Sequence, residues 1–296
     1  MRTHKLFRTD MAWEIAQEKL RAYGSSHAGV PDGVRNEEFE QFGFSTQRVR
    51  LCTPQAAELF GKDMGCYTTL FVGDVTDLSR QQDALQALCA EISHCIRLAA
   101  AQEHVALPRR ILLAGLGNRD MACDAIGPLT AGEVTVTGAP GKDRGVWCLA
   151  PGVTSQTGME TAELIRAAAK LCRAEMIVLA DALAARTAQW LCKTVQISSC
   201  GIRPGSGAGH HRQSVTAQSM GVPVVTLGVP MLIDAATLLL NALPETAQPP
   251  EETLQSYAKM PVTVNHVDTA AFAWGRLLAG ALDCAFASLL SQDCPA

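Results

Sequence analysis

Aromatic side chains and an excess of positive charge are both scarce in this chain of 296 residues. Phe, Trp and Tyr make up 5% of it, and 25 Lys and Arg face 29 Asp and Glu, for a formal net charge of −4. Proteins that bind single strands stack bases on aromatic rings, and those that bind duplexes need a basic surface. We therefore expect no direct binding of nucleic acid.

Long hydrophobic runs are also missing, because Asp, Arg or Asn interrupts each candidate before it reaches the length that crosses a bilayer. The first residues, MRTHKLFRTD, lack the apolar stretch of a signal peptide. We therefore expect a soluble cytoplasmic protein with no membrane partner.

Cysteine is present, but not in a pattern that implies cross-links or metal. The chain has 11 cysteines, an odd number, and no C-x-x-C pair. A disulfide framework and a thiolate zinc site are therefore disfavoured. Most of these residues are expected to be small buried hydrophobes, while Cys123 and Cys200 lie among predicted loop residues and remain candidate nucleophiles.

Several motifs of nucleotide-binding and hydrolytic enzymes are incomplete. The segment GLGNRD lacks the third glycine of a dinucleotide loop, and RPGSGAGHHR at 203–212 lacks the Gly-Lys-Ser/Thr of a phosphate loop. Ser206 does not complete G-x-S-x-G. No H-E-x-x-H occurs, and the adjacent His210 and His211 cannot share a face, so a zinc hydrolase is disfavoured. We predict no cofactor and no metal, and we interpret 203–212 as a wall of the site, with an anion-binding nest as the alternative.

The sequence does contain a regular alternation of strand and helix patterns. A short apolar run typical of a buried parallel strand lies at 111–115, and further strands are predicted at 146–150, 176–180, 193–197 and 223–228. Helical patterns separate most of them, at 124–134, 158–172 and 231–243, and a closing helix is predicted near 266–290. This order predicts a single α/β domain with an open, mostly parallel twisted sheet flanked by helices.

The N-terminal third is less regular. We predict helices at 10–22, 54–61 and 78–101, strands at 45–53 and 66–72, and a loop over 24–43. Residues 242–262, rich in Pro and Glu at their start, are predicted to be a linker before the closing helix.

Two aspartates are placed by the pattern where α/β proteins collect reactive groups, beyond the carboxyl ends of the strands. Asp181 directly follows the run MIVLA, and Asp124 precedes a predicted helix. Each alone is more often a helix cap. Neighbouring strands are about 4.8 Å apart, so the two carboxylates can meet and share one proton, which supplies a general base and a general acid.

Further residues are candidates for supporting roles. Backbone N–H groups around Asn118, and around Gly205 and Gly207, could stabilise an oxyanion. Glu160 is interpreted as a first-turn acid that opposes a helix dipole, or else as a side chain that faces the crevice.

Six blocks of the sequence carry a resemblance to a known family: FRTDMA at 7–12, GLGNRDMACDAIGP at 115–128, PGVTSQTGMET at 151–161, IVLADALAAR at 177–186, IRPGSGAGHHR at 202–212 and GVPVVTLGVPMLIDAAT at 221–237. In this order they resemble the germination protease family of spore-forming bacteria, which degrades small acid-soluble spore proteins. A seventh stretch, VTVNHVDTAAFAWGRLLAGAL, is similar to the closing helix of that family.

The resemblance implies a fold related to the hydrogenase maturation endopeptidases and an atypical aspartic-type mechanism on Asp124 and Asp181. It implies a zymogen that cuts its own chain between Asp10 and Met11, so that residues 1–10 are a propeptide and 11–296 the protease domain. Small acid-soluble spore proteins would be the substrates, in the cytoplasm of the spore core. A homotetramer is also implied.

The chain departs from the family pattern in three places. The segment between LLLNAL and MPVTV is shorter, DMAC stands before Asp124 in place of V-T-P, and SSCG replaces D-T/S-G at 198–201. Two alternatives stay open. One is a metal-dependent endopeptidase with Asp124, Asp181 and His210 as ligands. The other is a catalytically silent binding protein of the same fold.

Overall fold

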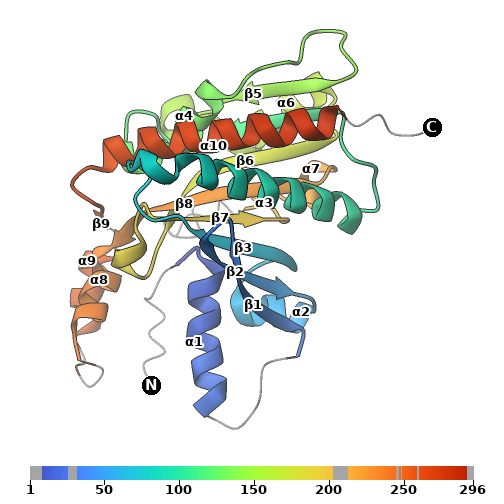
Figure 1. Cartoon of the computed structure of the whole chain (residues 1–296). Helices are drawn as coiled ribbons and strands as arrows, with labels where there is room; N and C mark the ends of the chain where they lie inside the picture. Colours follow the sequence, from blue (N-terminus) through green and yellow to red (C-terminus); the bar gives the residue numbers. More distant parts are fainter. Residues whose placement is uncertain are drawn as a thin grey trace.

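A single mixed sheet organises the chain in the computed structural model (Figure 1). The structure describes residues 9–25, 32–202, 213–244, 247, 249–258 and 260–291. In this part of the chain the sheet has nine strands in the order β1-β2-β3-β7-β8-β6-β4-β5, with β9 beside β8. The strands are β1 Val34–Gln41, β2 Phe44–Leu51, β3 Gly65–Phe71, β4 Arg110–Gly115, β5 Gly145–Leu149, β6 Met176–Ala184, β7 Thr194–Ser198, β8 Val224–Asp234 and β9 Pro261–Val262.

Helices cover both faces of this sheet. The α-helices are α1 Ala12–Ser25, α2 Pro54–Phe60, α3 Gln81–Gln102, α4 Ile126–Glu133, α5 Thr154–Thr157, α6 Thr161–Cys172, α7 Ala217–Met220, α8 Ala235–Ala242, α9 Glu251–Tyr257 and α10 Val267–Leu290. Short 3-10 turns occur at η1 Leu78–Arg80, η2 Ala122–Asp124 and η3 Ala188–Trp190. The α/β class and the open sheet flanked by helices are thus confirmed.

The sheet has a parallel half and an antiparallel half. Strands β8, β6, β4 and β5 run parallel, and their apolar runs are those that the sequence pattern indicated. Strands β1, β2, β3, β7 and β8 pair antiparallel. The sheet is therefore mixed, and its parallel half is the part that carries the helices of the expected alternation.

The predicted loop over 24–43 is wrong for its second half, which forms β1. Most residues of β1 are exposed. Its sequence VRNEEFEQ is polar because, among the described residues, the strand lies at the edge of the sheet and pairs with β2 alone. Charged residues are common on edge strands, where they discourage pairing with other chains. Hydrophobic alternation is absent from such a strand, so its pattern does not indicate a strand.

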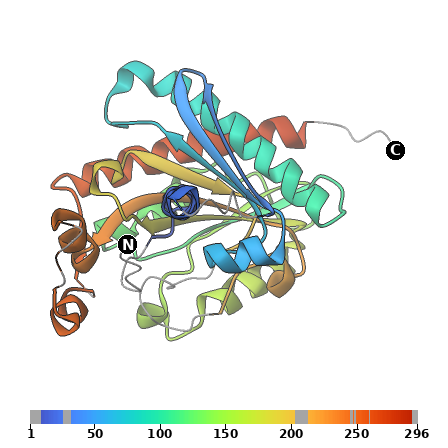
Figure 2. The same cartoon turned by 90° about the horizontal axis from the view of Figure 1, so that it is seen from below.

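The two faces of the sheet bury different sets of side chains. Helices α3 and α10 lie on one side, and α2 and α6 lie on the other (Figure 2). The first side holds the largest core cluster, which includes Leu88, Ile92 and Trp274. On the second side, α6 covers β4 and β6 through Ile165 and its neighbours, and α1 packs through Trp13 over the antiparallel half.

Helix α10 corrects the expectation that no segment is apolar enough to cross a membrane. Among the described residues it is the one helix that is long and apolar enough to cross a membrane, by length and composition alone. However, 56% of its most apolar window is buried inside the molecule. Its Trp274 is fully buried, and the indole Nε1 donates to the carbonyl of Cys192 at 2.7 Å. These contacts are those of a core helix.

The segment predicted to be a linker, 242–262, carries two short elements. Helix α9 begins after Pro250 with Glu251 and Glu252 in its first turn, and β9 pairs with the end of β8. Acidic side chains in a first turn interact favourably with the helix dipole, so the acidic stretch that suggested a linker also starts a helix.

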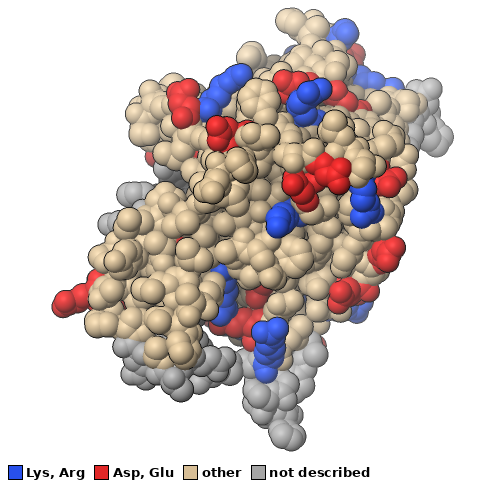
Figure 3. All heavy atoms as spheres, turned by 60° about the vertical axis from the view of Figure 1, so that its left-hand side comes forward, with Lys and Arg blue, Asp and Glu red and all other residues tan. Residues whose placement is uncertain are grey.

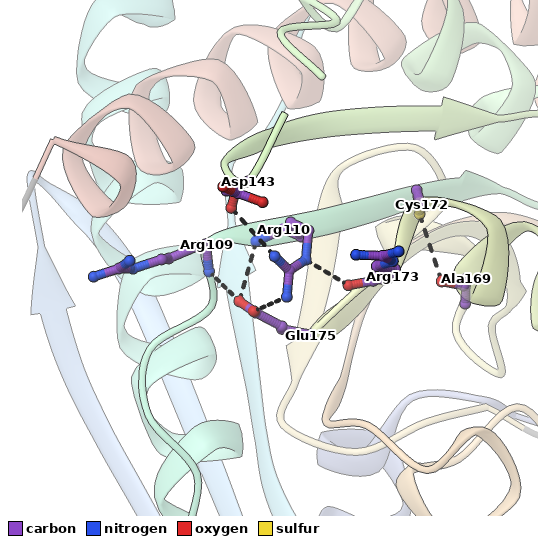
Figure 4. Close-up of polar contacts among 7 residues, drawn as sticks. All are labelled: Arg109, Arg110, Asp143, Ala169, Cys172, Arg173 and Glu175. Atoms are coloured by element: carbon purple, nitrogen blue, oxygen red, sulfur yellow. Dashed lines mark hydrogen bonds and ion pairs between the residues drawn. The ribbon is translucent and has the colours of Figure 1, made fainter. Parts of the chain in front are cut away.

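Charged side chains fasten the amino ends of three parallel strands (Figure 4). Arg110 at the start of β4 forms an ion pair with Glu175 before β6, and its Nε donates to the carbonyl of Arg173 at 2.8 Å. Its Nη1 donates to the carbonyl of Asp143 before β5 at 3.4 Å. Glu175 also accepts the backbone N–H of Arg109 at 2.6 Å. One arginine therefore links β4, β5 and β6 at this edge.

Candidate active site

Asp181 lies inside strand β6, and the prediction that it directly follows the strand is wrong. The strand continues to Ala184 because β8 pairs with it along its whole second half, with Asp181 opposite Gly228. The side chain is half-buried, and its Oδ1 accepts the N–H of Ala182 at 2.9 Å. Position 181 is therefore held by strand pairing on the β8 side and is not a helix cap.

Asp124 ends the turn η2, which follows β4, the neighbour of β6 in the sheet. Its Oδ2 accepts the backbone N–H of Asn118 at 2.8 Å, and the N-cap position of α4 is taken by Ala125. The expected alternative of a helix cap is therefore not what holds Asp124. Gly117, with a φ of 111°, brings the loop against it, since a Cβ at Gly117 would overlap the Asp124 carbonyl oxygen.

A close contact between two glycines fixes the start of α4 against the strands. A Cβ on Gly127 would overlap the carbonyl oxygens of Leu116 and Ala180, and one on Gly115 would overlap the Gly127 carbonyl. The helix therefore lies directly on the ends of β4 and β6. This contact explains the glycine that follows Asp124 at three residues' distance in DAIGP.

The structure brings both aspartates to the carboxyl edge of neighbouring strands. Strands β4 and β6 are adjacent, and the N–H of Leu116 after β4 donates to the carbonyl of Ala180 at 2.8 Å, one residue before Asp181. The turn η2 that carries Asp124 packs against both β6 and β8. The location that the pattern predicted is thus seen, and the sharing of a proton stays a prediction.

The supporting candidates have different surroundings. Because the N–H of Asn118 donates to Asp124, it positions that carboxylate and is not free to hold an oxyanion. The side-chain Oδ1 of Asn118 accepts Nε2 of Gln156 at 2.8 Å. Glu160 occupies the N-cap position of α6 and makes no capping hydrogen bond with its side chain. Gly205, Gly207 and His210 lie outside the described residues.

The segment around Asp10 is bound to the end of β6. The N–H of Asp10 donates to the carbonyl of Ala184 at 2.9 Å, and the N–H of Ala184 donates to Oδ2 of Asp10 at 2.9 Å. Met11 is 1% exposed and Ala12 is fully buried. The register of β6 on β8 shifts at this point, between Leu183 and Ala184. The predicted cleavage site is therefore docked at the same edge of the sheet as Asp181.

Glu14 and Gln196 fasten this segment, and neither was among the residues predicted from the sequence. Glu14 is 4% exposed and accepts the N–H groups of Arg186 and Thr187, each at 2.8 Å. Gln196 of β7 donates from Nε2 to the carbonyl of Asp10 at 3.1 Å. Gln196 could have been noticed in the sequence as a glutamine within the apolar run KTVQI, because a buried polar side chain needs a hydrogen-bond partner.

The two cysteines considered as nucleophiles are both held as thiols. Burial raises the pKa of Cys200 to about 11, and its Sγ donates to the carbonyl of Met64 at 3.4 Å. Burial, and then the negative charge of Asp124, raise the pKa of Cys123. A nucleophilic cysteine needs a lowered pKa, so neither site favours thiolate chemistry. The ten described cysteines are all free.

Near Asp10, burial lowers the pKa of Lys62, while Asp10, Cys200 and Asp63 oppose that shift. The ammonium lies 5.6 Å from the ring centroid of Tyr67. Burial also raises the pKa of Tyr67, whose hydroxyl donates to the carbonyl of Asp63 at 2.8 Å. A lysine whose pKa is lowered by burial therefore interacts electrostatically with the aspartate of the docked segment.

A metal site, a cavity and a basic surface patch are the other kinds of site to consider. The described residues include no group of three or more His, Cys, Asp and Glu side chains placed to hold a metal. A cavity of about 540 Å³ lies between β5 and α10, lined among others by Val146, Asp283 and Phe286, and neither aspartate reaches it. On the face that Figure 3 shows, Lys and Arg alternate with Asp and Glu and do not form a basic patch.

Fold and site together define an α/β protein with two aspartates at the carboxyl ends of neighbouring parallel strands, where open α/β sheets bind ligands. A family model described as germination protease matches residues 10–244. The chain belongs to the germination protease family, and it is a peptidase.

Individual relatives agree with this family. The germination protease of Clostridium perfringens is 34% identical over 80% of this chain and 73% of its own length. That of Caldanaerobacter subterraneus is 34% identical over 78% of this chain and 70% of its own length. Among solved structures, a [NiFe] hydrogenase maturation protease from Thermococcus kodakarensis is 17% identical over 58% of this chain and 93% of its own, with a TM-score of 0.30.

Proposed function

We propose that this chain is the endopeptidase that hydrolyses small acid-soluble spore proteins during germination, and that it is made as a zymogen. The observation that carries the proposal is the docking of Asp10 on Ala184, three residues along β6 from Asp181. This docking holds Asp10 at the end of the strand that carries Asp181, which supports Asp181 as a carboxylate acting on the bond between Asp10 and Met11. Removal of residues 1–10 would leave the protease domain 11–296.

The proposed mechanism divides the work between two aspartates. One ionised carboxylate of the Asp124 and Asp181 pair takes a proton from water, whose oxygen attacks the peptide carbonyl carbon. The other, protonated, gives its proton to the amide nitrogen as the C–N bond breaks. The products are a new carboxyl group and a new amine. Two carboxylates at neighbouring strand ends favour a shared proton, because close like charges disfavour double ionisation.

Further properties follow from the same proposal. The family match is consistent with small spore proteins as substrates. We also propose the cytoplasm of the spore core as the location and a homotetramer as the assembly. Sedimentation of the purified chain tests the last of these. A mass of one subunit, at concentrations where cleavage is measured, would contradict it.

The central experiment measures cleavage in two ways. The purified chain is incubated with a small acid-soluble spore protein, and both substrate fragments and the enzyme's own N-terminus are mapped by mass. We expect a new N-terminus at Met11, and we expect Asp181→Asn and Asp124→Asn each to lower both rates by roughly 10³-fold or more. The free energy of unfolding should change little. Wild-type-like turnover in either variant would refute the paired-aspartate mechanism.

A chelator arm tests the metal-dependent alternative. Preincubation with EDTA should leave both cleavage rates unchanged, whereas loss of activity that Zn²⁺ or another divalent cation restores would favour that alternative. If neither cleavage occurs with the wild-type chain under any condition in which it is folded, a silent binding protein is favoured.

A further inference from the structure

The side chain of Gln196 contacts the backbone on either side of Met11, next to the bond between Asp10 and Met11. It is 7% exposed and lies in an apolar strand, where a primary amide needs partners for both its ends. Nε2 donates to the carbonyl oxygen of Asp10 at 3.1 Å, and Oε1 accepts the N–H of Ala12 at 2.6 Å. The amide therefore contacts the backbone on both sides of one peptide bond.

Gln196 and Asp181 occupy one row of the sheet. Gln196 pairs with Gly228 in the antiparallel β7–β8 ladder, and Asp181 pairs with Gly228 in the parallel β6–β8 ladder. Directly paired residues of adjacent strands direct their side chains to the same face, so both side chains lie on one face with a glycine between them. Two strand spacings separate their Cα atoms, about 10 Å.

The docked segment joins the end of β6, three residues beyond Asp181, to Gln196 of β7. Asp10 binds Ala184 of β6 with its N–H and carboxylate and binds Gln196 of β7 with its carbonyl. The segment therefore crosses over β8 between the strand of Asp181 and the strand of Gln196. Gly228 carries no side chain, and the Leu183 side chain packs directly over it, since a Cβ at Gly228 would overlap Leu183.

We propose that Gln196 is a catalytic residue of this cleavage, with Nε2 as the donor that holds the developing oxyanion. The inference rests on the proposed function. When water adds to the carbonyl carbon of Asp10, negative charge grows on the oxygen that Nε2 already contacts, so the hydrogen bond strengthens in the transition state. Oε1, through the N–H of Ala12, fixes the chain on the leaving side. The amide itself neither gains nor loses a proton.

The same amide serves a second peptide once residues 1–10 have left. Ala12 stays in the chain and keeps Oε1, while Nε2 loses its acceptor. A buried donor without a partner is unfavourable, so the carbonyl of a substrate protein binds in place of that of Asp10. Because Nε2 contacts backbone only, it can act on the scissile carbonyl whatever the flanking side chains are.

Two substitutions separate an oxyanion role from a docking role. Gln196→Glu keeps an acceptor for the N–H of Ala12 and removes the donor, and Gln196→Met removes both without adding charge. Thr194→Val is the matched control, because Thr194 lies on the same strand and face, is fully buried, and its Oγ1 has no hydrogen-bond partner. All chains are the full 296 residues.

The readouts are the first-order rate of self-cleavage after Asp10, and kcat and KM on a small acid-soluble spore protein. We expect both Gln196 variants to lose roughly 100-fold in self-cleavage and in kcat at neutral pH, with KM within about threefold of wild type. Thr194→Val should match wild type. As the pH falls, Gln196→Glu should regain part of its rate relative to wild type, since a protonated carboxyl donates again, and Gln196→Met should not.

A self-cleavage rate and a kcat within about threefold of wild type in folded Gln196→Met would overturn the inference and leave Gln196 as a tie for α1. That result is distinct from failure of the proposed function, in which the wild-type chain and the Thr194→Val control also fail to cleave. Asp181→Asn, which should abolish the reaction, sets the floor against which the residual rate of the Gln196 variants is measured.

Discussion

At the amino ends of β4, β5 and β6 the strands are tied together by charged side chains, whereas at the carboxyl ends of β4 and β6 they are tied by backbone. Arg110 and Glu175 provide the first set of ties. At the second edge, α4 lies against the strands through Gly115 and Gly127, where no side chain could fit. The same sheet is therefore closed in two chemically different ways.

This difference shows how one sheet can be stable and still present reactive groups. Backbone contacts of Gly115, Gly127 and Leu116 hold the loop after β4 against the neighbouring strand at the carboxyl edge. The Asp124 carboxylate is oriented by the N–H of Asn118, and the Asp181 carboxylate by that of Ala182. At the amino edge, removal of one charge loosens the structure, and at the carboxyl edge removal of one charge should stop the chemistry.

The largest expected effect on stability comes from adding one methyl group at the carboxyl edge. In Gly127→Ala the new Cβ would overlap the carbonyl oxygens of Leu116 and Ala180, which are backbone and cannot rotate away. We expect a loss of about 3 kcal/mol in the free energy of unfolding, measured by urea denaturation, because overpacked sites must shift the backbone. Cleavage should fall as well, since the turn that carries Asp124 leads directly into α4.

Gly132→Ala is the control for that substitution. Gly132 lies in the same helix and is exposed, and a Cβ added there would meet nothing closer than an arginine nitrogen of Arg119 at 3.9 Å. Alanine favours helix over glycine by about 1 kcal/mol, so this variant should be slightly more stable than wild type and fully active. If Gly127→Ala behaved like Gly132→Ala, the contact between α4 and the strand ends would not be what fixes this edge.

The parallel half of the sheet could be predicted because each of its strands begins as an apolar run of typical length. The end of β6 could not, because ADALA continues as strand only through pairing with β8, and that pairing depends on residues far along the chain. Asp181 was therefore placed at the correct edge but outside the strand. Strand β1 was missed for the opposite reason, since its polar sequence reflects an edge position that only the topology reveals.

The contacts of Gln196 could not be predicted from the sequence for a related reason. Its partner, the carbonyl of Asp10, lies 186 residues away in the chain. The two aspartates could be found because strand ends are marked by a change from apolar to polar residues. A single amide within a strand gives no sign of the face to which it points or of what is docked there, and both depend on the register of β7 on β8.

A smaller effect is expected at the amino edge. Glu175→Gln removes the ion pair with Arg110 and weakens the hydrogen bonds from the N–H groups of Arg109 and Arg110. Both side chains are partly exposed, so solvent screens the pair, and we expect a loss of about 1 kcal/mol in the free energy of unfolding. Self-cleavage and kcat should stay at the wild-type values.

Glu163→Gln provides the comparison for an ion pair that links no strands. Glu163 pairs with Arg166 three residues later on the surface of α6. Its removal should leave the unfolding curve where it is, and high salt should narrow the gap between Glu175→Gln and wild type. A loss of activity in Glu175→Gln at unchanged stability would contradict the claim that the amino edge contributes to stability and the carboxyl edge to catalysis.

The smallest expected effect concerns His94, whose titration should change how stability depends on pH but not how activity depends on pH. His94 on α3 faces Arg48, Arg50 and Glu91, and its Nε2 is buried without a hydrogen-bond partner. Burial, and then the positive charge of Arg48, lower the pKa of His94. The unfolded chain then binds a proton on His94 at a higher pH than the folded chain does. The free energy of unfolding is therefore highest above a pH of about 6.5, as far as His94 contributes to it, and it decreases as the pH drops below that value.

Replacing this imidazole by an amide removes the titration. His94→Gln should show a shallower fall of unfolding free energy between about pH 7 and pH 5, by less than about 1 kcal/mol, when urea curves are compared with wild type. The pH profile of cleavage should not move, because the charges that act on His94 are those of Arg48, Arg50 and Glu91, and not those of the turn η2 and strand β6 that carry Asp124 and Asp181. A shift in that profile would mean that acid acts on catalysis through α3, and the carboxyl edge would then not set the pH dependence by itself.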